Sequence, residues 1–430
     1  MFLALTLLTA CGKDHAAADS DAERPANVLM VSLDTLRRDA VGHYNPQSDD
    51  TPFLDEVLAA SLTLEDHRSC SNWTYGSTVC AMTGLSGGDA GFIPGSWDAQ
   101  NPMPDDLGVL PGWLRAAGYR TALVSSNFYV GSTSGLTRHF DHTFQEHEGR
   151  ADTIVDNALR LHADMTTVGD SPWFLHAHFF DPHAGYDAPA SYLSALDGLA
   201  PSPVDVTDGA LVQTMEERWD ELTEEEQALT LEHMRIRYAA EVRYLDDELR
   251  RLFDALEDRG ALEDTLVVFW SDHGEQFGEH GFFDHGKTLY GEEIAAMAAF
   301  WGAGVTPGGW EGPTSHQDLA PTLMSLLGLA EPEGVMGVPV GEAVGARFAM
   351  RRNEFHLQSV DQDGLRLMYW WEDGRLALYD VAADPGERDD RYDPSDPRVL
   401  ALWELLKPRV ELAREFTAGD APPVWPPEVR

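Results

Sequence analysis

The sequence predicts an α/β protein in which a large, mostly parallel central sheet lies between helices, with a small antiparallel α+β subdomain at the C-terminus. Two features of the chain carry this prediction. Short, continuously apolar runs alternate with helical patterns up to about residue 345, which is typical of parallel strands joined by helices. After that residue, two strand-like runs around a turn and one further helix replace the alternation. A chain of 430 residues, 43% of them hydrophobic, can bury a large core.

Four apolar runs are the expected strands of the central sheet. Each is short and continuously apolar, as expected for a strand that is buried on both faces. They cover residues 27–33, 120–126, 172–180 and 264–271. Helices are expected between them over residues 51–61, 107–117, 152–164 and 223–259. Thr51 and Pro52 supply a cap and a first-turn proline for the first helix.

The C-terminal region is expected to hold a hairpin and a helix. The segments "LRLMYWW" and "RLALYDV" are strand-like and enclose the turn "EDG". The helix is expected over residues 399–412.

The charge balance is strongly acidic. The chain contains 73 Asp and Glu against 30 Lys and Arg, a formal net charge of −43. Proteins that bind nucleic acid hold its phosphates with clustered Lys and Arg, so we expect no nucleic-acid partner. We interpret the acidity as a solvated, self-repelling surface.

The N-terminus resembles a bacterial lipoprotein signal. The apolar run "MFLALTLLTAC" is too short to span a bilayer and ends in small residues and Cys11. Cys11 would be the lipidated first residue of the mature protein, which predicts a cell-envelope lipoprotein facing the periplasm or the exterior. The residue after Cys11 is Gly12, whereas lipoproteins retained in the inner membrane carry Asp at that position. The outer membrane is therefore the favoured location. The acyl chains are the one membrane attachment we expect.

Two of the three cysteines flank a polar loop, "SCSNWTYGSTVCAMTGL", at residues 69–85. Cys70 and Cys80 can pair in an oxidising compartment or remain as two buried thiols. The sequence leaves both alternatives open.

Acidic and imidazole side chains follow three of the expected strands. Asp34 follows the run 27–33, His183 follows 172–180, and Asp272 and His273 follow 264–271. The carboxyl ends of parallel strands meet at one edge of a sheet, where ligands bind in open α/β folds. Carboxylates and imidazoles are metal ligands, so their arrival at one edge predicts a metal site with donors for an oxyanion.

Several segments together resemble the sulfatase family of the alkaline phosphatase superfamily. They are "NVLMVSLDTLRRDAVGHY", "WTYGSTVCAMTGL", "FFDPHAGYDAP", "SDHGEQFGEHGFFDHGKTLY", "DLAPTLMSLLG" and "LYDVAADPGE". The resemblance covers roughly residues 26–390. It implies a signal and linker over 1–25, a catalytic domain over 26–345 and a C-terminal subdomain over 346–430.

The resemblance also indicates the nucleophile. In well-known sulfatases a Cys or Ser that becomes formylglycine lies nine positions before a Thr-Gly pair, and here that position is Thr74. Gly76 and Thr78 stand where those sulfatases have Pro and Arg. The Trp-Thr loop is similar to that of phosphoethanolamine and phosphoglycerol transferases, which implies an unmodified threonine nucleophile.

The same resemblance implies the metal and substrate residues. Asp34, Thr74, Asp272 and His273 form a set for one divalent ion. Two carboxylates, an imidazole and an alkoxide favour Zn²⁺ or Mn²⁺ over Ca²⁺ or Mg²⁺. His183 and His285 are expected to be catalytic and to donate to substrate oxygens, and Lys287 to assist in substrate binding. Arg37 is expected to be structural, and the residues expected to lie outside the ligand set are His178, Glu275, Glu279 and His280.

These residues predict a metal-dependent hydrolase of sulfate or phosphate esters that acts through a covalent Thr74 intermediate. The substrate would be a sulfated or phosphorylated small molecule or glycan. Two alternatives remain: a transferase that passes a phospho-group to an envelope glycan or lipid, and an inactive binding protein that keeps the fold.

Overall fold

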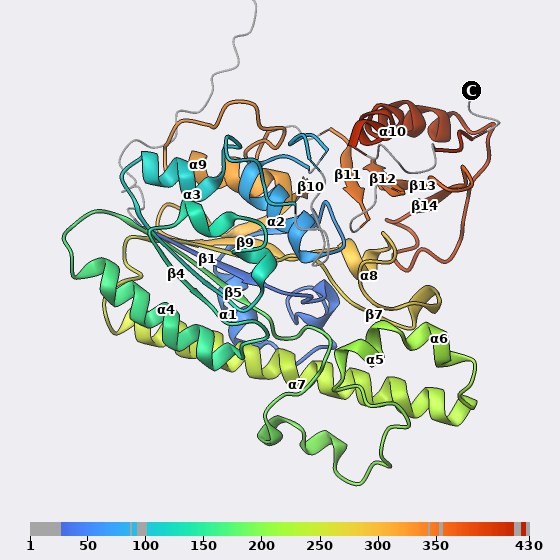
Figure 1. Cartoon of the computed structure of the whole chain (residues 1–430), viewed down its shortest axis with the longest axis horizontal. Helices are drawn as coiled ribbons and strands as arrows, with labels where there is room; N and C mark the ends of the chain where they lie inside the picture. Colours follow the sequence, from blue (N-terminus) through green and yellow to red (C-terminus); the bar gives the residue numbers. More distant parts are fainter. Residues whose placement is uncertain are drawn as a thin grey trace, which may run out of the picture.

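The computed structural model describes residues 27–86, 88–92, 101–342, 345–351, 356–416 and 423–426. The predicted signal segment with Cys11 lies outside the described residues. In Figure 1 the central sheet runs through the body of the molecule with helices on both sides, and the C-terminal sheet with its helix lies at one end. Within the described segments, no helix combines the length and apolar character needed to cross a membrane.

The central sheet has eight strands in the order β10-β2-β9-β6-β1-β5-β3-β4. All neighbouring pairs are parallel except those of β9, which runs antiparallel to both β2 and β6. The strands are β1 (Asn27–Leu33), β2 (Leu62–Arg68), β3 (Arg120–Ser125), β4 (His142–Gln145), β5 (Trp173–Phe179), β6 (Thr265–Ser271), β9 (Ala298–Gly302) and β10 (Gly308–Ser315). The four predicted strands are confirmed within one residue at each end, as is the mostly parallel sheet.

Helices cover the sheet on both faces, because successive residues of each buried strand point to opposite sides. Along β1, Leu29 and Val31 pack into one apolar core and Val28 and Met30 into the other. The first core is closed by α1 (Pro52–Ala59), α4 (Ala151–Thr166) and α7 (Glu224–Glu257), and the second by α2 (Thr74–Thr83), α3 (Leu110–Ala116) and α9 (Leu319–Leu326). The shorter elements are α5 (Gly209–Gln213), α6 (Met215–Trp219), α8 (Gly291–Ile294), β7 (Gln276–Phe277) and β8 (Phe283–Asp284).

The C-terminal region forms a four-stranded antiparallel sheet covered by one helix (Figure 1). Its elements are β11 (Arg347–Met350), β12 (Leu357–Gln362), β13 (Leu365–Trp370), β14 (Leu376–Asp380) and α10 (Pro397–Phe416). The predicted hairpin is confirmed as β13 and β14, and the predicted helix extends a few residues further at each end. Arg347 donates to the Asp66 carbonyl at 2.8 Å, which joins this sheet to β2 of the central sheet.

The cap of α1 differs from the prediction. Thr51 occupies the N-cap position, but its hydroxyl donates to Asp55 and makes no capping hydrogen bond. The first helical N–H groups, of Phe53 and Leu54, donate instead to the two oxygens of Asp246, each at 2.8 Å. Asp246 comes from α7, almost two hundred residues later, so nothing near Thr51 in the sequence indicates it.

Candidate active site

The strand ends converge as the sequence predicts. Leu33 at the end of β1 pairs with Phe179 of β5 on one side and Ser271 of β6 on the other. The next residues along β1 and β6 are Asp34 and Asp272, which therefore leave the sheet at the same level. Asp34 donates its N–H to the Phe179 carbonyl at 3.0 Å, and Asp272 donates its own to the Leu33 carbonyl at 3.2 Å.

Asp34, Asp272 and His273 form a fully buried group, which we call the strand-end cluster. His273 Nε2 lies 3.7 Å from Asp34 Oδ1 and 3.5 Å from Asp272 Oδ2. One ligand atom from each residue can be chosen so that all lie within 4.8 Å of one another. This spacing suits a shared cation.

The remaining polar atoms of the cluster fix its orientation. Asp272 Oδ1 accepts from the N–H groups of Thr35 at 3.0 Å and His273 at 2.8 Å. Thr35 has a positive φ of 51°, which is strained for a β-branched residue and turns its N–H towards Asp272. His273 Nδ1 lies 2.9 Å from the Gly274 carbonyl, so it carries the proton and leaves the Nε2 lone pair free.

The unpartnered atoms of the cluster fit a metal ion. Asp272 Oδ2 and His273 Nε2 are buried without a hydrogen-bond partner among the described residues. Burial and then the charge of Asp34 raise the pKa of Asp272, and burial lowers the pKa of His273. Burial works against ionisation of Asp34, but His178, His183 and His273 lower its pKa well below the usual range. Buried carboxylates held this close are stabilised when a cation binds between them.

Thr74 begins α2 and lies beside the cluster. Its Oγ1 is 3.4 Å from Asp34 Oδ1, and the side chain lines a cavity. Asn127 Nδ2 donates to Asp34 Oδ2 at 2.8 Å and lies 3.3 Å from Thr74 Oγ1. Its Oδ1 accepts from the Tyr129 N–H at 2.9 Å, which sets the orientation of the amide. The structure thus brings Thr74, Asp34, Asp272 and His273 together, and their role as metal ligands stays a prediction.

Sequence analysis missed Asn127. It lies two residues beyond the end of β3, a strand that was predicted, so it reaches the same edge of the sheet as Asp34. A polar side chain after a fourth strand end was the signal that could have found it.

Two histidines line the same cavity as Thr74. The rings of His183 and His285 lie 4.9 Å apart and nearly perpendicular, and Phe180 stacks on His183 at 4.3 Å. Burial opposes protonation of His285, but Asp284 and Glu275 raise its pKa well above the usual range. Glu275 Oε1 and Asp284 Oδ1 lie 3.1 Å and 3.3 Å from His285 Nδ1. His285 is therefore a charged donor, whereas burial lowers the pKa of His183 and keeps it neutral.

The structure does not bring Lys287 to the cavity. Its Nζ donates to Glu216 Oε1 at 2.6 Å and to the Gln213 carbonyl at 2.9 Å. Its contact with substrate stays a prediction. His178 lies behind Asp34, with its Nε2 3.4 Å from Asp34 Oδ2 and its Nδ1 2.9 Å from Ser32 Oγ.

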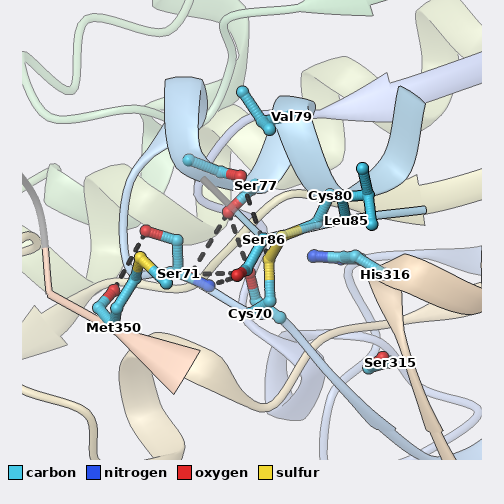
Figure 2. The surroundings of a disulfide bond; sticks show 12 residues. Cys70, Ser71, Ser77, Val79, Cys80, Leu85, Ser86, Ser315, His316 and Met350 are labelled. Carbon is cyan, nitrogen blue, oxygen red and sulfur yellow. Dashed lines mark hydrogen bonds between the residues drawn. A yellow bond between two sulfur atoms is a disulfide. The ribbon is translucent and has the colours of Figure 1, made fainter. Parts of the chain in front are cut away.

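A disulfide between Cys70 and Cys80 joins the loop before Thr74 to α2 (Figure 2). Of the two alternatives left open by the sequence, the structure has the paired one. Ser71 Oγ donates to the Met350 carbonyl at 3.1 Å, so β11 of the C-terminal sheet lies against this loop. A Cβ on Gly76 would lie 2.4 Å from Ser71 Oγ, so the loop has no room there for the proline of the well-known sulfatases.

The cavity above Thr74 has a volume of about 830 Å³. Its lining combines Thr74 and the two histidines with aromatic residues and a group of carboxylates. The lining residues include Thr74, His183, His285, Phe180, Arg150, Glu148, Asp181, Asp187, Asp208 and Glu241.

The chain belongs to the sulfatase family, whose profile matches residues 26–329. It is 29% identical to the choline-sulfatase of Rhizobium meliloti, over 89% of this chain and 86% of that protein. It is 20% identical to the arylsulfatase of Clostridium perfringens, over 92% and 96% respectively. Proteins of this kind are sulfate ester hydrolases that generally use a divalent metal, and this chain is a sulfatase-like hydrolase.

Solved structures give the same fold. One is a protein in complex with its substrate D-glucosamine-2-N,6-O-disulfate, with a TM-score of 0.74 and 18% identity over 91% of this chain and 99% of that one. Another is a phosphonate monoester hydrolase from Silicibacter pomeroyi, with a TM-score of 0.70 and 17% identity over 92% and 96% respectively. The predicted alkaline-phosphatase-like sulfatase fold is confirmed.

Proposed function

We propose that the protein hydrolyses sulfate or phosphate esters through a covalent intermediate on Thr74, with one divalent ion held by Thr74 and the strand-end cluster. The observation that carries this proposal is the position of Thr74 Oγ1, 3.4 Å from Asp34 Oδ1 and open to the cavity. A bound cation would lower the pKa of the Thr74 hydroxyl and stabilise negative charge on the ester.

The reaction has two displacements. In the first, Thr74 Oγ1 gives up its proton and bonds to sulfur or phosphorus as the bond to the alcohol oxygen breaks. The alcohol oxygen takes up one proton as it leaves, so the step releases no net proton. In the second, water attacks the same atom and releases sulfate or phosphate, which restores Thr74. The charged His285 can donate to a non-bridging oxygen in both steps, and neutral His183 can accept a proton from the water.

A threonine nucleophile affects the relative turnover rates of sulfate and phosphate esters. The hydrate of formylglycine carries two hydroxyls on one carbon, so the second can expel sulfate held by the first, whereas threonine has a single hydroxyl. Water must therefore attack the intermediate directly, which phosphorus permits more readily than sulfur. We infer that turnover of phosphate or phosphonate esters equals or exceeds turnover of sulfate esters.

The test is a substrate panel. Aryl sulfate, aryl phosphate, a phosphodiester and a phosphonate monoester are each assayed with Zn²⁺, Mn²⁺, Ca²⁺ and Mg²⁺, using wild type and Thr74→Ala. We expect wild-type turnover of at least one ester and none above background in the variant. A transferase would instead need an added acceptor alcohol for turnover, and a binding protein would turn over nothing.

We also propose that the protein is anchored in the cell envelope through a lipid on Cys11. The Cys70–Cys80 disulfide supports an oxidising compartment, since such bonds are rare in the cytosol. Cys11→Ala should leave the membrane fraction for the soluble one. Recovery of the variant in the membrane fraction would contradict the proposed lipid anchor.

A further inference from the structure

The lining of the cavity is acidic, with six carboxylates. Asp284 contacts His285, and we call the other five the carboxylate wall: Glu148, Asp181, Asp187, Asp208 and Glu241. Among the described lining residues, Arg150 is the one guanidinium and no lysine is present. Arg150 is already engaged, because its Nη2 donates to Asp187 Oδ2 at 3.1 Å and to the Asp187 carbonyl at 2.8 Å.

Two further members of the wall also have partners. Asp208 caps α5 by accepting the Ala210 N–H at 3.0 Å. Glu148 lies 3.6 Å from His147 Nε2. Asp181 and Glu241 differ from the other three members, which are exposed, because both are buried.

Asp181 and Glu241 form a buried pair at the cavity surface. Asp181 follows β5 and Glu241 lies on α7, and their exposed fractions are 8% and 6%. No N–H group of the described residues reaches Asp181 Oδ2. Burial raises the pKa of both carboxyls, and the charge of Asp181 raises that of Glu241 further. Burying two carboxyls side by side destabilises the folded protein. A cation that contacts an oxygen of each carboxyl would offset this cost.

An organic cation fits this pair better than a metal ion does. The described His, Cys, Asp and Glu side chains provide no third ligand within 4.8 Å of Asp181 and Glu241 together. A protonated amine needs fewer contacts, since each of its N–H groups donates to a single carboxylate oxygen. Phe180, next to Asp181, offers apolar surface to the carbon chain between the amine and the ester.

We propose that the carboxylate wall, through Asp181 and Glu241, binds a protonated amine on the alcohol portion of the substrate. This inference rests on the proposed hydrolysis at Thr74 and deepens it, since it names the substrates as sulfate or phosphate esters of amino alcohols or amino sugars. Polyanionic substrates such as multiply sulfated glycans are disfavoured, because they would place further negative charge against the wall.

The test compares two alcohols of equal chain length. 2-Aminoethyl and propyl esters, each as the sulfate and the phosphate, are assayed with wild type, Glu241→Gln and Asp181→Asn. We expect wild type to prefer the aminoethyl ester by at least about tenfold in kcat/KM, because a charged hydrogen bond contributes that much. The preference should fall towards one in both variants.

The matched control is Glu232→Gln, which makes the same change on an exposed residue of α7 and should keep the wild-type preference. Thermal unfolding of each variant checks that it folds. If neither variant folds, competitive inhibition of wild type by ethanolamine, with 1-propanol as the uncharged comparison, decides the question. Stronger inhibition by ethanolamine supports the inference, and equal inhibition overturns it.

The outcomes separate the two proposals. Equal turnover of aminoethyl and propyl esters by wild type would overturn the amine site and leave the hydrolase intact. Turnover of neither ester, nor of the aryl panel, would refute the hydrolase. Calorimetric titration of ethanolamine into wild type and Glu241→Gln would then still test the amine site, which requires tighter binding by wild type.

Discussion

The strand-end cluster and the carboxylate wall are both acidic and both line or adjoin one cavity, yet they are built differently. Asp34 and Asp272 of the cluster lie directly after neighbouring strands, so the sheet register alone brings them together. The wall combines Asp181, beyond β5, with Glu241 from the middle of α7, and their contact depends on how that helix packs. The proposed metal ligands are therefore positioned by the sheet, and the proposed amine-binding carboxylates by a helix and a loop.

The largest effect is expected at the proposed metal ligands of the strand-end cluster. Asp272→Ala and His273→Ala should each lose bound metal and lower activity by at least about a thousandfold, since a metal ion contributes several kcal/mol to catalysis. Metal content by mass spectrometry, measured with activity, checks this. Asp264→Ala, exposed just before β6, is the matched control and should keep both. Full metal occupancy in His273→Ala would contradict the assignment.

A smaller effect is expected at His285, which in the proposed mechanism contacts the transferred group and not the ion. His285→Ala should keep the metal and lower turnover about a hundred- to a thousandfold, the usual cost of removing one oxyanion donor. The same metal analysis separates it from the cluster variants. Equal metal loss in His285→Ala and Asp272→Ala would show that the two groups are not distinct.

The smallest effect concerns stability. The Cys70→Ser, Cys80→Ser double variant opens the loop that carries Thr74 and should lower the free energy of unfolding by about 2–3 kcal/mol, as expected for a disulfide closing a short loop. Denaturant unfolding measures it. Because the strand-end cluster is held by the sheet, metal content should be unchanged. Metal loss in this variant would mean that the loop, and not the sheet register, holds the cluster.

Prediction from sequence worked where local pattern and sheet topology suffice. The buried strands β1, β5 and β6 are continuously apolar, and Asp34, Asp272 and His273 follow them directly. Strand β10, with the sequence GGWEGPTS, was not predicted, because its glycines and its proline give no strand pattern. It forms by pairing with β2 across more than two hundred residues.

Contacts between distant segments could not be predicted from the sequence either. The cap that Asp246 provides for α1, the pair of Asp181 and Glu241, and the ion pair of Lys287 with Glu216 all join segments that no local pattern relates. The carboxylate wall was missed for this reason. Its members are scattered among the 73 acidic residues of the chain, most of which could equally be solvated surface charges.

The central claim is that Thr74 itself becomes covalently modified. Wild type is mixed with an activated aryl phosphate or aryl sulfate, quenched in acid within one turnover, and digested for peptide mass analysis. We predict one phospho or sulfo group on the peptide that contains Thr74, the same adduct on the corresponding peptide of Thr74→Ser, and none in Thr74→Ala. Turnover at the wild-type rate by Thr74→Ala, or an adduct on any other residue, would contradict the account.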